Sequence, residues 1–246
     1  MKISVCVDAV FKGKNFGTSL KEISNAGAKA FEFWSWWDKD FESVKKVKNE
    51  FGLTPVAFCT KMISLVKPSE RKNYIKGLTE SIEVAKSLEC KRLITQVGND
   101  TGYSRMSQKK SIVNGLKEAS YILEQSGITL LVEPLNVHVD HAGYFLSSSA
   151  EAFEIIDEVD SPNIKLLFDI YHQQITEGNI IRNITENIEK IGHFHAAGNP
   201  GRHELRYSEL NYNYIFEAIK KTSYRGYVGL EYFPLDDPIK GVKDCL

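Results

Sequence analysis

The sequence has no long hydrophobic run and no excess of either charge. No apolar stretch reaches about 18 residues, the minimum for an ordinary transmembrane helix. The 31 lysines and arginines nearly balance the 32 aspartates and glutamates, so the charge gives no indication of binding to nucleic acid or to an anionic membrane. We therefore expect a small molecule as the partner, with neither nucleic acid nor membrane.

Nucleotide-binding loops and paired cysteines are also absent. Neither GxGxxG nor GxxxxGK[ST] occurs, so no nucleotide cofactor is expected. The cysteines, at positions 6, 59, 90 and 245, form no CxxC pair, which favours reduced thiols over disulfides. A strand-like run starts at Ile3 without a preceding basic segment and long apolar core, so we expect a cytoplasmic protein.

Eight short apolar runs alternate with segments of helical periodicity. Such runs are typical of parallel strands that are buried on both faces. The strands are predicted at 3–7, 30–34, 54–58, 92–97, 129–133, 165–169, 192–196 and 227–231. The helices are predicted at 19–25, 41–50, 69–88, 107–124, 149–158, 180–188 and 212–221.

This alternation predicts an α/β fold of the (β/α)₈ TIM barrel type, with residues 1–246 as a single domain. Eight units of about 31 residues fit a closed barrel better than an open sheet, which usually has five or six strands. The segment after Glu231, YFPLDDPIKGVKDCL, is short and contains prolines. We therefore expect a short or incomplete final helix, with a thin last wall or a homo-oligomer that covers it.

The last four predicted strands each end near a side chain that can bind a metal. These residues are Glu133, Asp169, His195 and Glu231. One acidic residue at a strand end more often caps a helix or pairs with a base, but four in consecutive units favour a shared site, because strand ends converge at one face of a barrel. Three carboxylates and one imidazole suit Mn²⁺ or Mg²⁺, and Co²⁺ is also compatible.

Four motifs in the second half of the chain carry a family resemblance. EPLN at 133–136, FDIYH at 168–172, GHFHAAGNPGRHE at 192–204 and GLEYFP at 229–234 resemble the xylose isomerase-like TIM barrels, and among them the hydroxypyruvate isomerases and related sugar isomerases and epimerases. The resemblance implies that the four residues above bind one divalent metal ion. It also implies that Glu133 and Glu231 form a catalytic acid–base pair and that His172 and Arg202 bind the substrate.

The activity implied by this resemblance is that of a metal-dependent isomerase of the aldose–ketose type acting on a small hydroxy-carbonyl compound. Hydroxypyruvate, converted to tartronate semialdehyde, is the leading substrate. His195 is similar to the ketose 3-epimerases, but Val139 stands where these have a second glutamate. A ketose 3-epimerase or an inosose isomerase stays an alternative, and an endonuclease IV-like or dehydratase-type metalloenzyme is the alternative from another class.

Several other residues have two interpretations. Trp34, Trp36 and Trp37 form either an apolar wall over the substrate or a core or subunit contact. His138 and His141, in the loop after Glu133, either contact substrate or are solvated. His193 shares its strand face with His195 and is expected one layer deeper, as a hydrogen-bonded core residue.

Overall fold

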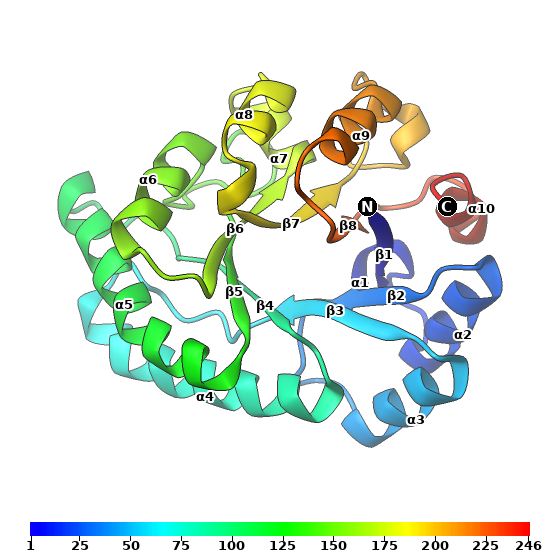
Figure 1. The fold of residues 1–246 in the computed structure, drawn as a ribbon, viewed down its shortest axis with the longest axis horizontal. Helices are drawn as coiled ribbons and strands as arrows, with labels where there is room; N and C mark the ends of the chain where they lie inside the picture. The colour runs from blue at the N-terminus through cyan, green and yellow to red at the C-terminus, as the bar shows by residue number, and fades with distance from the viewer.

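Eight parallel strands close into a barrel in the computed structural model, which describes residues 1–246 (Figure 1). Each strand pairs with the next, and β1 pairs with β8 to close the ring. The strands are β1 (Lys2–Cys6), β2 (Ala30–Phe33), β3 (Thr54–Cys59), β4 (Arg92–Thr95), β5 (Thr129–Val132), β6 (Ile164–Asp169), β7 (Ile191–Ala196) and β8 (Tyr227–Leu230). The predicted TIM barrel is confirmed.

Ten α-helices surround the barrel (Figure 1). They are α1 (Val7–Val10), α2 (Phe16–Ala26), α3 (Phe41–Phe51), α4 (Arg71–Leu88), α5 (Arg105–Ser126), α6 (Ser149–Val159), α7 (Ile170–Thr176), α8 (Ile180–Glu186), α9 (Tyr212–Lys221) and α10 (Pro238–Lys243). Short 3₁₀ turns cover Pro68–Glu70, Ile188–Lys190 and Leu205–Tyr207.

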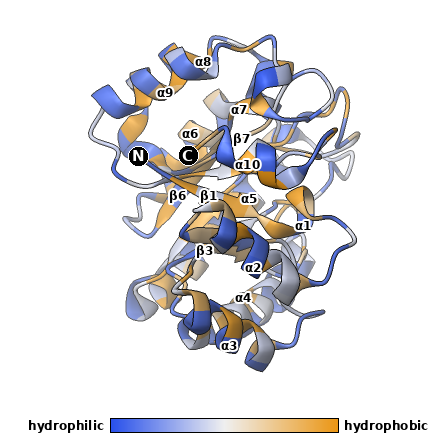
Figure 2. Ribbon diagram, turned by 90° about the vertical axis from the view of Figure 1, so that its right-hand side faces the viewer, coloured by the Kyte–Doolittle hydropathy of each residue, from blue (hydrophilic) through white to orange (hydrophobic).

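The hydrophobic pattern places the core between the strands and the helices. Strand residues are almost all buried, and each long helix buries one face. The helices in Figure 2 accordingly contain both hydrophilic and hydrophobic residues. Local signals fix the helix ends: the side chain of Asn15 accepts from the backbone N–H of Thr18 at the start of α2, and Gly27 ends that helix at a φ of 101°.

None of the helices combines the length and the apolar composition that a membrane-spanning helix needs. The four cysteines form no disulfide bond.

The structure contains two helices that were not predicted, α1 and α7, and it defines the final helix. Helix α7 was not predicted, because its seven residues directly follow the Asp169 strand end and are too few for a clear periodicity. The final helix is short, as expected, but Pro238 begins it at the first turn, where a proline is favourable. Helix α10 packs against α2, so this chain itself contributes to the last wall.

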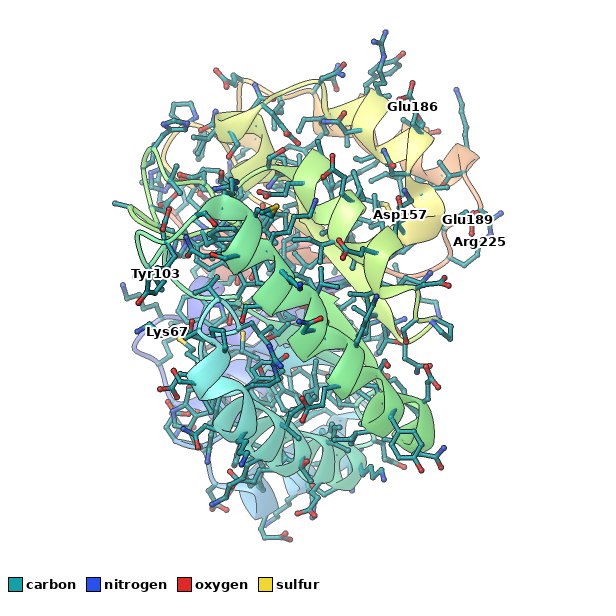
Figure 3. All side chains as sticks on the ribbon, turned by 90° about the vertical axis from the view of Figure 1, so that its left-hand side faces the viewer. Lys67, Tyr103, Asp157, Glu186, Glu189 and Arg225 are labelled. Carbon is teal, nitrogen blue, oxygen red and sulfur yellow. The ribbon has the colours of Figure 1, made fainter.

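A large cavity opens at the C-terminal ends of the strands. It has a volume of about 1420 Å³, and Lys67 and Tyr103 lie at its rim. Figure 3 shows these two residues at one edge of the molecule, while Glu189 and Arg225, which precede β7 and β8, lie at the opposite edge. The strand register sets Asp169 beside His195 and His195 beside Gly229, so the C-terminal ends of neighbouring strands lie at the same level of the barrel.

Candidate active site

The four predicted metal-binding side chains meet at the inner end of this cavity. One ligand atom from each of Glu133, Asp169, His195 and Glu231 lies within 4.8 Å of each of the others. All four are buried, with at most 5% of the residue exposed. Residues up to 98 positions apart in the chain thus meet because β5, β6, β7 and β8 are neighbours in the barrel.

Both glutamates are held by one carboxylate oxygen and present the other to the centre. Oε2 of Glu133 accepts from the side-chain amide of Gln96 at 3.0 Å, and its Oε1 lies 3.8 Å from Nδ1 of His195. Oε1 of Glu231 accepts from the indole N–H of Trp34 at 2.6 Å, and its Oε2 lies 3.3 Å from the same Nδ1. Oε1 of Glu133 and Oε2 of Glu231 therefore both lie close to Nδ1 of His195.

Asp169 and His195 are oriented in the same way. Oδ1 of Asp169 accepts from the backbone N–H groups of Tyr171 and His172 at 2.8 and 3.2 Å, which caps α7 and leaves Oδ2 free. Nε2 of His195 lies 2.9 Å from the carboxylate of Glu32, which leaves Nδ1 directed at the two glutamates. Asp169 is thus both a helix cap and a member of the acidic group.

Arg202 supplies the one guanidinium in contact with this group. Its Nη2 pairs with Oε2 of Glu231 and lies 3.9 Å from Oδ2 of Asp169. The backbone of Arg202 has a φ of 57°, in the left-handed region that a non-glycine residue rarely occupies, so the turn around it is constrained. Its guanidinium also lies 5.3 Å from the ring centre of Tyr171.

The two glutamates have opposite shifts in pKa. Burial, followed by the negative charge of Glu231, raises the pKa of Glu133 from its ordinary 4.5 to about 8. Burial acts in the same direction on Glu231, but His195 and Arg202 outweigh it and hold the pKa of Glu231 well below its usual range. Without a bound cation, Glu133 is therefore protonated at neutral pH while Glu231 is ionised.

The proton on His195 occupies the place where a cation would bind. Burial lowers the pKa of His195, but Glu231 and Glu32 outweigh burial and raise it well above the ordinary value. Nδ1 of His195 nevertheless has no hydrogen-bond partner in the protein, although its atom is buried. Such an atom, facing carboxylate oxygens, fits the role of a metal ligand.

The charge of the group also fits a divalent cation. With all three carboxylates ionised and His195 neutral, the one guanidinium would leave two negative charges uncompensated at this buried site, which is costly. A divalent cation would compensate both. The donor set, mostly oxygen with one imidazole nitrogen, matches the preferences of Mn²⁺ and Mg²⁺.

His172 lies beside this group and is fully buried. Its Nδ1 lies 2.6 Å from the side-chain amide of Asn136, so that amide donates and the hydrogen of the neutral ring sits on Nε2. Burial and the charge of Arg202 lower the pKa of His172 well below its ordinary value, which keeps the ring neutral. The Nε2–H has no hydrogen-bond partner, lies 3.6 Å from Asp169 and faces the cavity.

Of the remaining candidate residues, some line the cavity and others lie away from it. Trp34 lines the cavity, whereas the indole of Trp36 donates to Ser81 away from it and Trp37 packs on Trp36. His141 lines the cavity and His138 is exposed outside it. His193 is a buried, hydrogen-bonded histidine below His195, as expected.

Three supporting residues were not identified from the sequence as partners of Glu133, Glu231 and His195: Gln96, Trp34 and Glu32. Gln96 directly follows β4, just as Glu133 follows β5 and Glu231 follows β8. A polar residue at the end of the fourth strand was therefore an available signal. The hydrogen bonds of Trp34 and Glu32 cross to β8 and β7, and no spacing in the sequence indicates such a pairing.

A closed (β/α)₈ barrel with buried acids and an imidazole at its strand ends has the arrangement of a TIM-barrel enzyme. The family model described as xylose isomerase-like TIM barrel matches residues 20–246. The hydroxypyruvate isomerase of Escherichia coli K12 is 30% identical over 244 residues, which cover 95% of this chain and 94% of the relative. The chain therefore belongs to the xylose isomerase-like TIM barrel family.

Two further comparisons agree with this assignment. The 2-oxo-tetronate isomerase of Haemophilus influenzae is 28% identical over 251 residues, covering 98% of this chain and 96% of the relative. The crystal structure of "AP endonuclease, family 2" from Brucella melitensis superposes with a TM-score of 0.91 at 27% identity, covering 98% of this chain and 96% of the other. Relatives over nearly the whole length identify the protein as an isomerase.

Proposed function

We propose that Glu133, Asp169, His195 and Glu231 bind one divalent metal ion, Mn²⁺ or Mg²⁺, with Co²⁺ also compatible. The observation that carries this proposal is the arrangement of the four side chains, each with one atom held by a neighbour and the other aimed at a common position. When bound, the cation supplies Lewis acidity that stabilises negative charge on the substrate oxygens.

The reaction we propose is the transfer of a proton between adjacent carbons of a hydroxy-carbonyl compound. A hydrogen on carbon beside a carbonyl is a weak acid, so a positioned carboxylate must remove it. Glu231 and Glu133 both line the inner cavity and are the two groups that can take up and return the proton. The Nε2–H of His172 donates to a substrate oxygen, and the guanidinium of Arg202 binds a carboxylate or hydroxyl group.

Hydroxypyruvate is the first substrate to test. Its adjacent carbonyl and hydroxyl groups suit the proposed proton transfer, and its carboxylate suits the guanidinium of Arg202. The Escherichia coli relative is named for this substrate. A hydroxypyruvate isomerase also needs no nucleotide and no nucleic-acid groove, in line with the net charge of −1.

The cavity favours a longer hydroxy-carbonyl acid or sugar as a second candidate. At about 1420 Å³ it exceeds the roughly 300–1,000 Å³ of most small-molecule sites. It extends from the strand ends of β5 to β8 toward the loops that follow β3 and β4, where Ser64 and Thr101 have buried hydroxyl groups without partners. The 2-oxo-tetronate isomerase relative, ketoses and inososes define the compounds to compare.

The test is incorporation of solvent deuterium into substrate in D₂O, with and without Mn²⁺ or Mg²⁺. We expect metal-dependent incorporation with hydroxypyruvate or with one of the longer compounds, and a loss of at least about 100-fold in Glu231→Gln. Glu158→Gln, at an exposed position of α6 outside the cavity, serves as a matched control and should retain activity. Incorporation with none of these compounds, or equal activity of wild type and Glu231→Gln, contradicts the proposal.

A further inference from the structure

A second buried cluster lies one layer below the metal-binding group. Nε2 of His195 is 2.9 Å from Oε2 of Glu32, and Nε2 of His193 is 3.0 Å from Oε1 of the same carboxylate. The hydroxyl of Ser4 also donates to Glu32. All four residues are at most 2% exposed, so solvent does not reach the carboxylate of Glu32. The hydrogen bonds that stabilise its charge therefore come from these three side chains.

The chemistry of these groups fixes which nitrogen of His195 carries hydrogen. An ionised carboxylate only accepts hydrogen bonds, so both facing Nε2 atoms must be protonated. In a neutral imidazole the lone pair then lies on the other nitrogen. For His195 that nitrogen is Nδ1, the atom that faces Glu133 and Glu231. The contact with Glu32 therefore sets both the tautomer and the direction of the ring.

The neighbouring strand β8 leaves room for this contact. A Cβ atom at Gly229 of β8 would lie 2.5 Å from Oε1 of Glu32 and 2.8 Å from Cδ2 of His195. Any side chain at position 229 would thus displace one of the two residues. Glycine in the GLEYFP motif has a backbone of ordinary strand conformation here, so space and not flexibility explains it.

We propose that Glu32 is a positioning residue for the metal centre: it holds the Nε2–H of His195 and so keeps the Nδ1 lone pair directed at the cation. This role rests on the metal centre proposed above. Without Glu32 the ring can rotate or protonate the wrong nitrogen, and loss of such an outer hydrogen bond typically weakens metal binding 10- to 100-fold.

The same side chains could instead form a second metal site, and the test must distinguish this role from the positioning of His195. Ligand atoms of Glu32, His193 and His195 lie close enough to bind a metal ion themselves. A second ion there would require both imidazoles to give up the hydrogens that now face the carboxylate. The hydrogen-bonded arrangement predicts one equivalent of metal per chain, whereas a second centre predicts two.

Calorimetric titration of the metal-free protein with Mn²⁺ is the first experiment. We expect one equivalent in wild type, about 10- to 100-fold weaker binding in Glu32→Leu, and an intermediate value in Glu32→Gln, whose carbonyl can still accept from His195. His193→Leu removes the other imidazole and keeps the Glu32–His195 contact, so it should bind close to wild type. Equal affinity of wild type and Glu32→Leu overturns the role of Glu32, as does a second equivalent that His193→Leu removes.

Nitrogen NMR of histidine-labelled wild type, loaded with diamagnetic Zn²⁺, tests the same role without any variant. We expect Nδ1 of His195 to be bound to zinc and Nε2 to carry a hydrogen that exchanges slowly. Zinc on Nε2 overturns the inference even if Glu32→Leu does not fold. Absence of metal binding by wild type would contradict the proposed metal centre itself, whereas wild-type binding that is insensitive to Glu32 contradicts only this inference.

Discussion

The indole N–H of Trp34 donates to Oε1 of Glu231 across a distance of 2.6 Å. Trp34 directly follows β2, and Glu231 directly follows β8, so the bond links two strand ends on either side of β1. One carboxylate oxygen is thereby held, and the other faces His195. The catalytic candidate at position 231 thus depends on a residue 197 positions away.

Replacing Trp34 by Phe should lower the rate of proton transfer with little effect on folding. Phe keeps an aromatic wall at the cavity but removes the donor, so Glu231 loses a bond worth about 1 kcal/mol and with it a fixed orientation. We expect kcat to fall about 10-fold. Trp36→Phe removes a hydrogen bond to Ser81 outside the cavity and is the matched control. Identical kcat values for the two variants would contradict this account.

Asp169 should show separable effects as a metal ligand and as a helix cap. Asp169→Asn retains an oxygen that can accept from the N–H groups at the start of α7 but removes the charge, so we expect weaker Mn²⁺ binding and nearly unchanged stability of the metal-free protein. Asp169→Ala removes the cap as well and should cost about 1 kcal/mol of additional stability. Metal titration and denaturant unfolding measure the two effects. Weaker folding of Asp169→Asn than of Asp169→Ala would be inconsistent with the capping role.

Metal affinity should increase with pH. The pKa of Glu133 is raised to about 8 and that of His195 is also raised, so both carry protons in the metal-free protein at neutral pH. A cation must displace these protons, and each displaced proton makes affinity rise up to about tenfold per pH unit. Titrations in several buffers between about pH 6 and about pH 8 should show this rise together with proton release. Affinity independent of pH over this interval would exclude displacement of protons.

The free energy of unfolding of the metal-free protein should decrease with pH, because of the raised pKa of Glu133. Because its pKa is about 8 in the folded state against an ordinary 4.5, the folded protein binds more protons between these values. The contribution of Glu133 is therefore fully present below pH 4.5 and is lost as pH rises toward 8. Glu133→Gln, which mimics the protonated acid, should gain stability relative to wild type across that window. A difference that is constant with pH would show that Glu133 has an ordinary pKa.

Hydrophobic pattern was sufficient to predict the barrel, because eight buried runs separated by helix-length segments admit few other folds. It also indicated which side chains meet in the buried group that we propose to bind metal, since residues such as Asp169 and His195 end consecutive strands and the topology brings strand ends together. Helix α7 escaped prediction because the aspartate that ends β6 also caps the helix, leaving no turn between them.

The residues that orient the site could not be predicted in the same way. Glu32 and His193 lie 161 positions apart and come into contact only through closure of the barrel and the register of β2 relative to β7. Arg202 was expected to bind substrate, and the structure additionally places it against Glu231. Such pairings depend on side-chain direction at each strand end, which residue spacing does not encode.

The most direct test of the central claim is a crystal structure of the protein soaked in Mn²⁺, with an anomalous difference map collected near the manganese absorption edge. The account predicts one strong peak within bonding distance of Glu133, Asp169, Glu231 and Nδ1 of His195. No peak at that position, or a peak bound by other side chains, would contradict it.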